Sequence, residues 1–280
     1  MSELPAGLTT RPLEPGDSRA VYELMAASEK ADIGLVEIEE ADIVGDWQRP
    51  SHDLSARSVG VFDDDRLVAY GELTWEQVCD AAVHPDHRGH GIGTWLAARI
   101  QQIARQYGST VVGMPVPEGS PGDRLLEQLG YFVRWTSWVL KVPEGRTIVE
   151  RRLPDGYSIR TADTSEYEQI WTVVEDAFLE WSDRERSSLK DFAALVWQRP
   201  GFEPWHLRVV LGPDGAVVGV ANTWNVETDG AVETFVSRLG VHQDHRTRGL
   251  AQSLLVDAST RAVPAAPPHP ACRPIPEPAR

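Results

Sequence analysis

The sequence predicts two consecutive α/β (α+β) domains, each built around a mixed, mostly antiparallel sheet. One loop motif occurs twice, at residues 83–93 and 241–251, and such internal similarity indicates a repeated unit. The order of predicted strands and helices also restarts after a polar linker. The chain of 280 residues is long enough for two cores. We expect domains at 1–146 and 147–263, followed by a Pro-rich tail at 264–280.

The first domain opens with a helix between short strands. Its expected elements are a strand at 8–13, a helix at about 17–31, a helical loop to Pro50, and strands at 57–62, 67–73 and 77–83. The turn Pro15-Gly16-Asp17 provides a helix start. The acidic turn Asp63-Asp64-Asp65 favours a hairpin between two of the strands.

An amphipathic helix follows the first loop. Its apolar residues recur at steps of three or four, at Ile92, Trp95, Leu96, Ile100 and Ile103. This spacing forms one apolar stripe, typical of a helix that packs on a sheet. Beyond it the sequence predicts a strand at 110–114, a short helix at 124–129 and a closing aromatic strand at 131–141. These elements would complete the first domain.

The second domain repeats this order after the linker. Its expected elements are a strand ending at Arg160, helices at 165–178 and 186–197, a hairpin at 207–220, a strand at 232–241, and a helix beginning near Gly249. Seven of the seventeen residues in 264–280 are proline, so neither strand nor helix fits there. We expect the second domain to be incomplete, and we hypothesise that it is truncated by a frameshift in a GC-rich gene or has degenerated.

The repeated loop has the properties of an anion site. Each copy ends an apolar run and opens a helix, so successive backbone N–H groups and the positive end of the helix converge. Gly91 and Gly93 avoid a Cβ that would obstruct phosphate oxygens or crowd the turn. This geometry suits a pyrophosphate.

The spacing Arg-x-x-Gly-x-Gly/Ala, which starts at Arg88 and at Arg246, resembles the acetyl-CoA loop of the GNAT superfamily of N-acetyltransferases. The two copies make the chain similar to tandem GNAT proteins, an arrangement shared with mycothiol synthase. The resemblance implies GNAT-like domains, acetyl-CoA as co-substrate and N-acetyltransferase activity. The implied cofactor-binding residues of the first domain are Ala81, Ala82, Val83, Arg88, Gly89, His90, Gly91, Ile92 and Gly93. Those of the second domain are Leu239, Gly240, Val241, Arg246, Thr247, Arg248, Gly249, Leu250 and Ala251.

Two other interpretations of the loop are weaker. The glycines of 89–93 differ from a dinucleotide fingerprint, because the third falls one position early and no strand-ending acid follows at the expected distance. His84, His87 and His90 recur every third residue, but an irregular loop gives that spacing no common face. We therefore expect solvated or loop-bracing histidines and no metal.

Acetyl transfer from a thioester to an amine requires a base, a polarised carbonyl and a stabilised thiolate. By resemblance, the main chain of the strand before each loop binds pantetheine and polarises the carbonyl. The candidate bases are Glu72, Glu76 and Asp80 in the first domain and Glu233 in the second. An ordinary solvent-facing strand acid is the alternative for each of them.

The chain departs from the GNAT pattern at the residue that protonates the departing thiolate. Leu126 stands where the family's later helix often carries a tyrosine that protonates the thiolate, and Gly119 stands at its asparagine. Tyr131 is a candidate to replace that acid, although we expect it more strongly to be a packed aromatic residue of a strand. Cys79 has no identifiable activating histidine, so we expect a core thiol and no acyl-enzyme.

Net charge and cysteine content narrow the classes of binding partner and the expected location of the protein. A net charge of −15 opposes nucleic acid and anionic membranes, which each require a basic face. A small amine fits better, and the acidic segment 37–42 could attract it. Two cysteines without a framework, no leader-like N-terminus and no stretch long enough for a bilayer favour a cytoplasmic protein. A homodimer and a monomer both remain alternatives.

Together these features favour acetyl-CoA-dependent N-acetylation of a primary amine on a small molecule, by direct transfer in a ternary complex. The first domain is the better suited to hold the cofactor. The alternative is a non-catalytic acyl-CoA-binding or scaffolding pseudo-acetyltransferase, which the missing tyrosine and the incomplete second domain favour. A third alternative is an unstable chain that self-associates because its second core cannot close.

Overall fold

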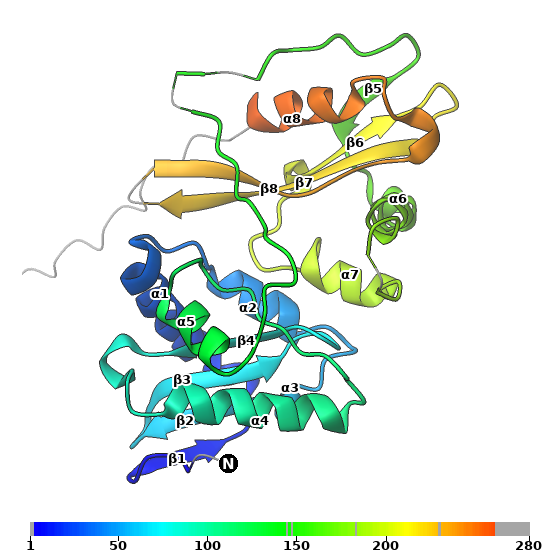
Figure 1. Ribbon diagram of the computed structural model, residues 1–280. Coiled ribbons are helices and arrows are strands. Elements are labelled where there is room, and N and C mark those ends of the chain that lie inside the picture. The colour runs from blue at the N-terminus through cyan, green and yellow to red at the C-terminus, as the bar shows by residue number, and fades with distance from the viewer. Residues whose placement is uncertain (1–2, 144, 147, 183, 229–230, 261–280) are drawn as a thin grey trace, which may run out of the picture. The chain divides into compact units, whose positions relative to one another are not determined.

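The structure is a computed structural model that describes residues 3–143, 145–146, 148–182, 184–228 and 231–260. These residues form two compact units (Figure 1). The first unit lies within Met1–Arg146 and Asp183–Glu203, and the second lies within Thr147–Ser182 and Pro204–Arg280. The expected division into consecutive segments therefore differs at 183–203, which packs with the first unit. The expected tail at 264–280 lies outside the described residues.

The first unit is built on a four-stranded sheet in the order β1-β2-β3-β4, and all three pairings are antiparallel. Its strands are β1 Leu8–Arg11, β2 Ser58–Asp63, β3 Arg66–Leu73 and β4 Cys79–Val83. The predicted hairpin between β2 and β3 turns at Asp64, whose positive φ of 50° is one that Asp tolerates. β4 is the last strand in this order and forms one edge of the sheet.

Helices lie on both faces of this sheet (Figure 1). They are α1 Ser18–Ile33, α2 Glu40–Trp47, α3 Leu54–Arg57, α4 Ile92–Gln106 and α5 Pro121–Gln128. The predicted apolar stripe of α4 is buried, with Leu96 packed on the middle of the sheet and Ile100 near its end. A Cβ on Gly71 would come within 3.1 Å of Ile100, so this glycine permits close contact between α4 and β3. α1 contributes Val21 and Leu24 to a separate cluster.

The helix α7 Leu189–Leu195 belongs to the first unit, although the sequence places it among second-domain elements. Gln48 donates from Nε2 to the carbonyl oxygens of Ala194 and Gln198 at 3.0 and 2.9 Å. Asp191 accepts from the backbone N–H of Ser51 at 3.0 Å. These bonds fasten α7 to the end of α2. Sequence order could not reveal them, because they join residues about 150 positions apart.

Two strands expected in the first unit are not formed. Within 110–114 only Gly113 forms an isolated parallel bridge, with Val78, and the described residues of 131–141 belong to no strand. Phe132 and Leu140 are 85% and 88% exposed. The expectation of a completed first sheet is therefore wrong at these elements. Aromatic and β-branched composition indicates a segment able to form a strand, but a strand also requires a partner edge.

The second unit repeats the strand order of the first. Its sheet is ordered β5-β6-β7-β8 with antiparallel pairings. Its elements are β5 Ser158–Thr161, α6 Tyr167–Leu179, β6 Leu207–Leu211, β7 Val217–Thr228, β8 Ala231–Val241 and α8 Leu250–Thr260. β7 extends past the predicted hairpin because its pairing with β8 continues beyond a register shift between Asn222 and Thr223. Two antiparallel, helix-covered sheets confirm the predicted fold class.

No helix in the described parts of the chain combines the length and the apolar character needed to cross a membrane.

Candidate functional site

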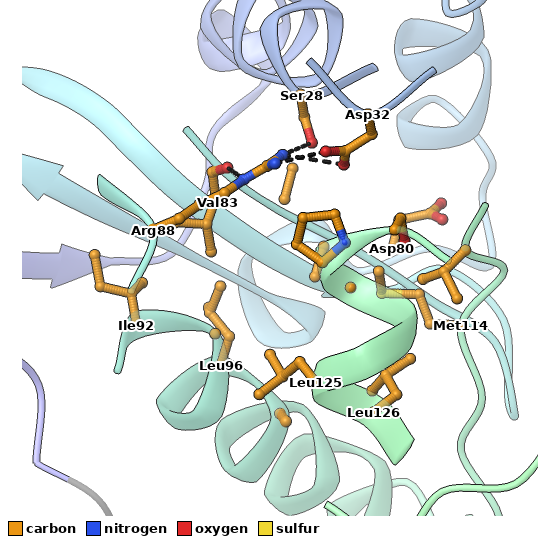
Figure 2. Close-up of a pocket in the computed structure, with 18 of the residues that line it drawn as sticks. Ser28, Asp32, Asp80, Val83, Arg88, Ile92, Leu96, Met114, Leu125 and Leu126 are labelled. Atoms are coloured by element: carbon orange, nitrogen blue, oxygen red, sulfur yellow. Dashed lines mark hydrogen bonds and ion pairs between the residues drawn. The ribbon is translucent and has the colours of Figure 1, made fainter. Parts of the chain in front are cut away.

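A pocket of about 630 Å³ lies in the first unit between α1, β4, the following loop, α4 and α5 (Figure 2). Nine of the sequence-predicted cofactor and base residues line it, namely Asp80, Ala81, Ala82, Val83, Arg88, Gly89, Gly91, Ile92 and Gly93. His90 does not line it. β4 is an edge strand, and at its two ends the N–H of Cys79 donates to the carbonyl of Gly113 at 2.9 Å and the carbonyl of Val83 accepts from Arg88 at 3.2 Å.

The loop of the first unit presents an open helix N-terminus to the pocket. Gly89 and Gly91 have φ of 81° and 85°, which favours glycine, and Gly91 is the N-cap of α4. A Cβ on either residue would meet no atom within 4 Å. Gly93 differs, because a Cβ there would lie 2.7 Å from Leu125. Gly93 therefore permits contact between α4 and α5, whereas Gly89 and Gly91 shape the turn.

The guanidinium of Arg88 is bound by the protein itself. It donates to both carboxylate oxygens of Asp32 at 2.5 and 3.1 Å and to Ser28 Oγ at 2.8 Å (Figure 2). Its Nε donates to the carbonyl of Val83 at 3.2 Å. This bidentate ion pair fastens the loop to α1, and Arg88 still lines the pocket. Asp32 and Ser28 belong to no motif, so the sequence does not single them out.

The second unit repeats this ion pair but not the open loop. Arg246 donates to Glu180, the C-cap of α6, at 2.6 and 2.7 Å and to the carbonyl of Val241 at 2.9 Å. A Cβ on Gly249, the counterpart of Gly91, would lie only 2.5 Å from the side chain of Arg151. The linker thus covers the position that is open in the first unit.

Two carboxyl groups face each other across the strands beside the pocket. Glu72 and Asp80 are direct partners in the β3–β4 register. Glu72 is 5% exposed and accepts from Trp47 Nε1 at 2.8 Å. Burial, together with the charge of Asp80, raises the pKa of Glu72 to about 8. Burial, together with the charge of Asp46, raises the pKa of Asp80 to about 6.

The structure separates the four candidate bases. Asp80 is partly exposed and lines the pocket, whereas Glu72 is buried behind it. Glu76 is exposed and does not line the pocket. Glu233 is exposed on β8 in the second unit and does not line it either. Of the four, Asp80 is the carboxyl group that a pocket-bound molecule can reach.

Tyr131 also lines the pocket, together with Leu125 and Leu126. Its hydroxyl accepts a hydrogen bond from Gln101 Nε2 at 2.9 Å. The expectation of a packed strand aromatic is wrong, because residue 131 is in no strand and its side chain faces α4 instead. Only the tyrosine's position directly after a predicted helix could have signalled this.

The loop histidines make local contacts. His84 accepts from the backbone N–H of Asp86 at 3.3 Å, and its Nε2 lies 2.9 Å from an Arg66 nitrogen. His87 lies 3.4 Å from Asp63. In the second unit Tyr157 Oη lies 2.9 Å from His245 Nδ1. No group of three or more His, Cys, Asp or Glu among the described residues could hold a metal ion.

Cys79 is a buried thiol at the start of β4. Its Sγ donates to the carbonyl of Gly113 at 3.4 Å. Burial raises the pKa of Cys79 to about 12, so the thiol stays protonated at neutral pH. This environment does not favour a thiolate nucleophile.

Comparison with known proteins agrees with this geometry. The sequence model of the Acetyltransferase (GNAT) family matches residues 20–131, which include the loop, both strand acids and the helices around the pocket. The chain is 25% identical over 239 residues to the mycothiol acetyltransferase of Saccharopolyspora erythraea, covering 79% of this chain and 74% of that protein.

Two solved structures share the fold. A GCN5-related N-acetyltransferase from Sphaerobacter thermophilus has a TM-score of 0.63 at 23% identity, with 93% of this chain and 85% of that chain covered. A tandem GNAT protein from the clavulanic acid biosynthesis pathway has a TM-score of 0.59 at 18% identity, with 90% and 84% covered. The family model thus matches the first unit over residues 20–131, and the chain as a whole has the fold of these two structures.

Proposed function

We propose that the first unit transfers the acetyl group of acetyl-CoA to a primary amine of a small molecule, directly and within a ternary complex. The observation that carries this proposal is one pocket that joins an open, anion-suited helix N-terminus to Asp80. Such a pocket can hold the donor at one end and deprotonate an acceptor at the other.

The donor would lie along β4 and α4. Backbone N–H groups at Gly89 to Gly93 and the N-terminal end of the α4 dipole favour a pyrophosphate. Asp80 precedes Val83 by three residues, which corresponds to about 10 Å along a strand. A pantetheine arm that starts at the loop and follows β4 would therefore carry its thioester toward Asp80.

Asp80 is the proposed general base. A carboxyl group with a pKa of about 6 is mostly ionised at neutral pH and is a stronger base than an exposed aspartate. Burial keeps Glu72 largely protonated at pH 7, because its pKa is about 8. The charge of Asp80 contributes to that raised pKa, so the pair divides into one charged and one neutral member.

Several features support a small, amine-bearing acceptor. The pocket wall carries Glu29, Glu37 and Asp80, and an acidic wall attracts a protonated amine. The relative from Saccharopolyspora erythraea is named a mycothiol acetyltransferase, and that name refers to a small molecule. A volume of about 630 Å³ is typical of a pocket for small molecules. Direct transfer is favoured because the thiol of Cys79 is held protonated.

The second loop supports assignment of the donor to the first unit. The side chain of Arg151 lies against Gly249, where a Cβ would come within 2.5 Å of it, and Thr247 takes the place of Gly89 with a φ of 61°. The N-terminus of α8 is therefore covered by the chain itself.

The test is release of CoA thiol from acetyl-CoA with a panel of small amines, for the wild type and for Gly91→Asp. Aspartate tolerates a positive φ, and its carboxylate would repel a pyrophosphate at the open loop. Gly249→Asp is the matched control. We expect amine-dependent release by the wild type and the control, and at least a tenfold lower rate for Gly91→Asp. Binding of acetyl-CoA without release for any amine would instead support the non-catalytic alternative.

A further inference from the structure

We propose that residues 188–199, here named the α7 segment, are a positioning element for the reactive site of the first unit. The α7 segment holds α2 in place, and Trp47 of α2 holds the Glu72 carboxyl beside Asp80. This role rests on the proposed function of the first unit. The sequence places the segment among second-domain elements, whereas the structure packs it with the first unit, where α7 lies beside α2 (Figure 1).

Trp47 fixes the Glu72 carboxyl. The indole Nε1 donates to Glu72 Oε2 at 2.8 Å, and both side chains are buried. Glu72 and Asp80 are direct partners across β3 and β4. Side chains that are opposite each other in an antiparallel pair leave the same face, with their Cβ atoms about 5 Å apart. Trp47 therefore determines where the Glu72 carboxyl lies relative to Asp80.

A misplaced Glu72 would weaken the proposed base. Its pKa of about 8 keeps the Glu72 carboxyl mostly protonated at neutral pH. A protonated carboxyl released from Trp47 can donate a hydrogen bond to the Asp80 carboxylate opposite. Such a bond stabilises the charged form of Asp80, so it lowers the pKa of Asp80 and makes it a weaker base. The bond from Trp47 competes with that contact.

A second contact fastens the end of α2 to the same strand. Arg49 is 2% exposed, donates to the carbonyl of Thr74 at 2.6 Å, and lies over the ring of Trp75 at 3.8 Å from the centroid. Trp47 and Arg49 are two residues apart, as are their partners Glu72 and Thr74. The C-terminal end of α2 therefore contacts β3 and the residue after it at two successive positions.

The α7 segment holds α2 at both of its ends. Arg199 is buried and donates from Nε to Asp42 at 3.0 Å, and a second of its nitrogens pairs with Glu39, the N-cap of α2. Gln48, the C-cap, donates to two carbonyl oxygens of the α7 segment at 3.0 and 2.9 Å. These contacts fix the helix that carries Trp47.

The α7 segment also acts on α2 between and beyond these ends. Gly45 is buried, and a Cβ there would lie 3.5 Å from a carbonyl oxygen of α7. Asp191 is 6% exposed and accepts from the backbone N–H of Ser51 at 3.0 Å. Burial lowers the pKa of Arg49, and the negative charges of Asp46 and Asp191 oppose that shift. The segment therefore supports the contacts of α2 with β3 by packing and by charge.

Other charged groups surround Asp80. Burial, together with the charge of Asp46 on α2, raises the pKa of Asp80. Tyr70 on β3 stays neutral, because burial raises its pKa. None of the α4 and α5 residues that line the pocket is titratable. The titratable side chains on the remaining pocket walls are Glu29, Asp32, Glu37, Cys79, His87, Arg88 and Tyr131. A substitution of Trp47 or of the α7 segment leaves all these groups in place.

The first test removes the indole donor. Trp47→Phe keeps an aromatic ring, but it frees Glu72 to contact Asp80. We expect the plateau of kcat to fall about tenfold, because a weaker base accepts the amine proton. The rise of kcat with pH should move below about 6, because the pKa of Asp80 falls. Affinity for acetyl-CoA by calorimetry should be unchanged. Trp95→Phe, at a partly buried tryptophan of α4, is the matched control.

The second test loosens α2 from the α7 segment. Arg199→Gln and Gln48→Leu should each lower the plateau of kcat and move its rise to lower pH, both less than Trp47→Phe does. Adding either change to Trp47→Phe should lower kcat no further, because all of them act through one hydrogen bond. Gln48→Leu removes no charge and decides the test if Arg199→Gln does not fold. Arg160→Gln, which breaks an ion pair with Glu166 in the second unit, is the control.

Three results would overturn this role and leave the proposed function intact. The first is a wild-type profile of kcat against pH in Trp47→Phe. The second is a lower kcat whose rise stays at the wild-type pH, as expected if α2 only supports the fold. The third is a wild-type profile in Gln48→Leu and in folded Arg199→Gln. A wild type that releases no thiol with any amine would instead overturn the proposed function, and this role with it.

Discussion

Burial gives two neighbouring carboxyl groups different chemistry. Glu72 and Asp80 are opposite each other on β3 and β4, yet their pKa values are about 8 and about 6. Burial raises both pKa values, and the charge of Asp80 adds to the shift of Glu72, whereas Asp80 is the one that lines the pocket. At neutral pH this arrangement provides a charged group where an amine can reach it and a neutral group behind it.

Asp80→Asn tests the proposed base. We expect kcat to fall about 100-fold or more, because the amide cannot accept the amine proton. In the wild type, kcat should rise as pH increases through about 6 and then level off, since the carboxyl must be ionised. Rate profiles from pH 5 to 9 check both expectations. Glu76→Gln, at an exposed acid, is the control, and an unaltered rate in Asp80→Asn would exclude this role.

Glu72→Gln tests the buried carboxyl through stability. Because the folded state raises the pKa of Glu72 from 4.5 to about 8, this group favours folding fully below about pH 4.5, and the benefit is lost as pH rises toward 8. The glutamine variant stays neutral. We expect it to match the wild type near pH 4.5 and to be more stable at pH 9 by up to about 5 kcal/mol. Denaturant titrations measure this difference, and equal stabilities at pH 9 would contradict it.

At the scale of elements, each loop is fastened to the first helix of its unit. Arg88 ties the first loop to α1 through Asp32, and Arg246 ties the second loop to α6 through Glu180. Because this ion pair occurs in both units, we infer that the arginine of each motif holds its loop in place. The N–H groups of the loop are then the proposed contacts for phosphate.

Asp32→Asn distinguishes the two roles of Arg88. If Arg88 positions the loop, Asp32→Asn and Arg88→Gln should each weaken acetyl-CoA binding several-fold, and the double variant should be no worse than the stronger single change. If Arg88 held phosphate, removing the carboxylate would free the guanidinium and strengthen binding. Calorimetric dissociation constants for the three variants decide between these outcomes. Arg19→Gln, at an exposed pair on α1, is the control.

The sequence predicts where helices and strands lie better than it predicts which elements they pack against. Apolar periodicity locates α4 and the paired strands, because these signals lie within the segment itself. It misses the packing of α7 on α2, which depends on bonds such as that between Ser51 and Asp191. It also predicts a strand at 131–141 that finds no partner. The sequence does not identify Asp32 for the same reason, since its partner Arg88 lies 56 positions away.

At the scale of the whole molecule, one repeated motif serves two different surroundings. Both units have the same strand order, and both loops keep their arginine and the helix that follows. The first loop opens into a pocket, whereas Arg151 covers the second. We therefore expect the chain to bind acetyl-CoA at one site, in the first unit.

Calorimetric titration of acetyl-CoA into the full chain tests this claim most directly. We expect one molecule bound per chain, binding weakened at least tenfold in Gly91→Asp, and the wild-type dissociation constant in Gly249→Asp. Circular dichroism of both variants would verify that each remains folded. Two bound molecules per chain, or loss of binding in Gly249→Asp with retention in Gly91→Asp, would contradict the assignment of the donor to the first unit.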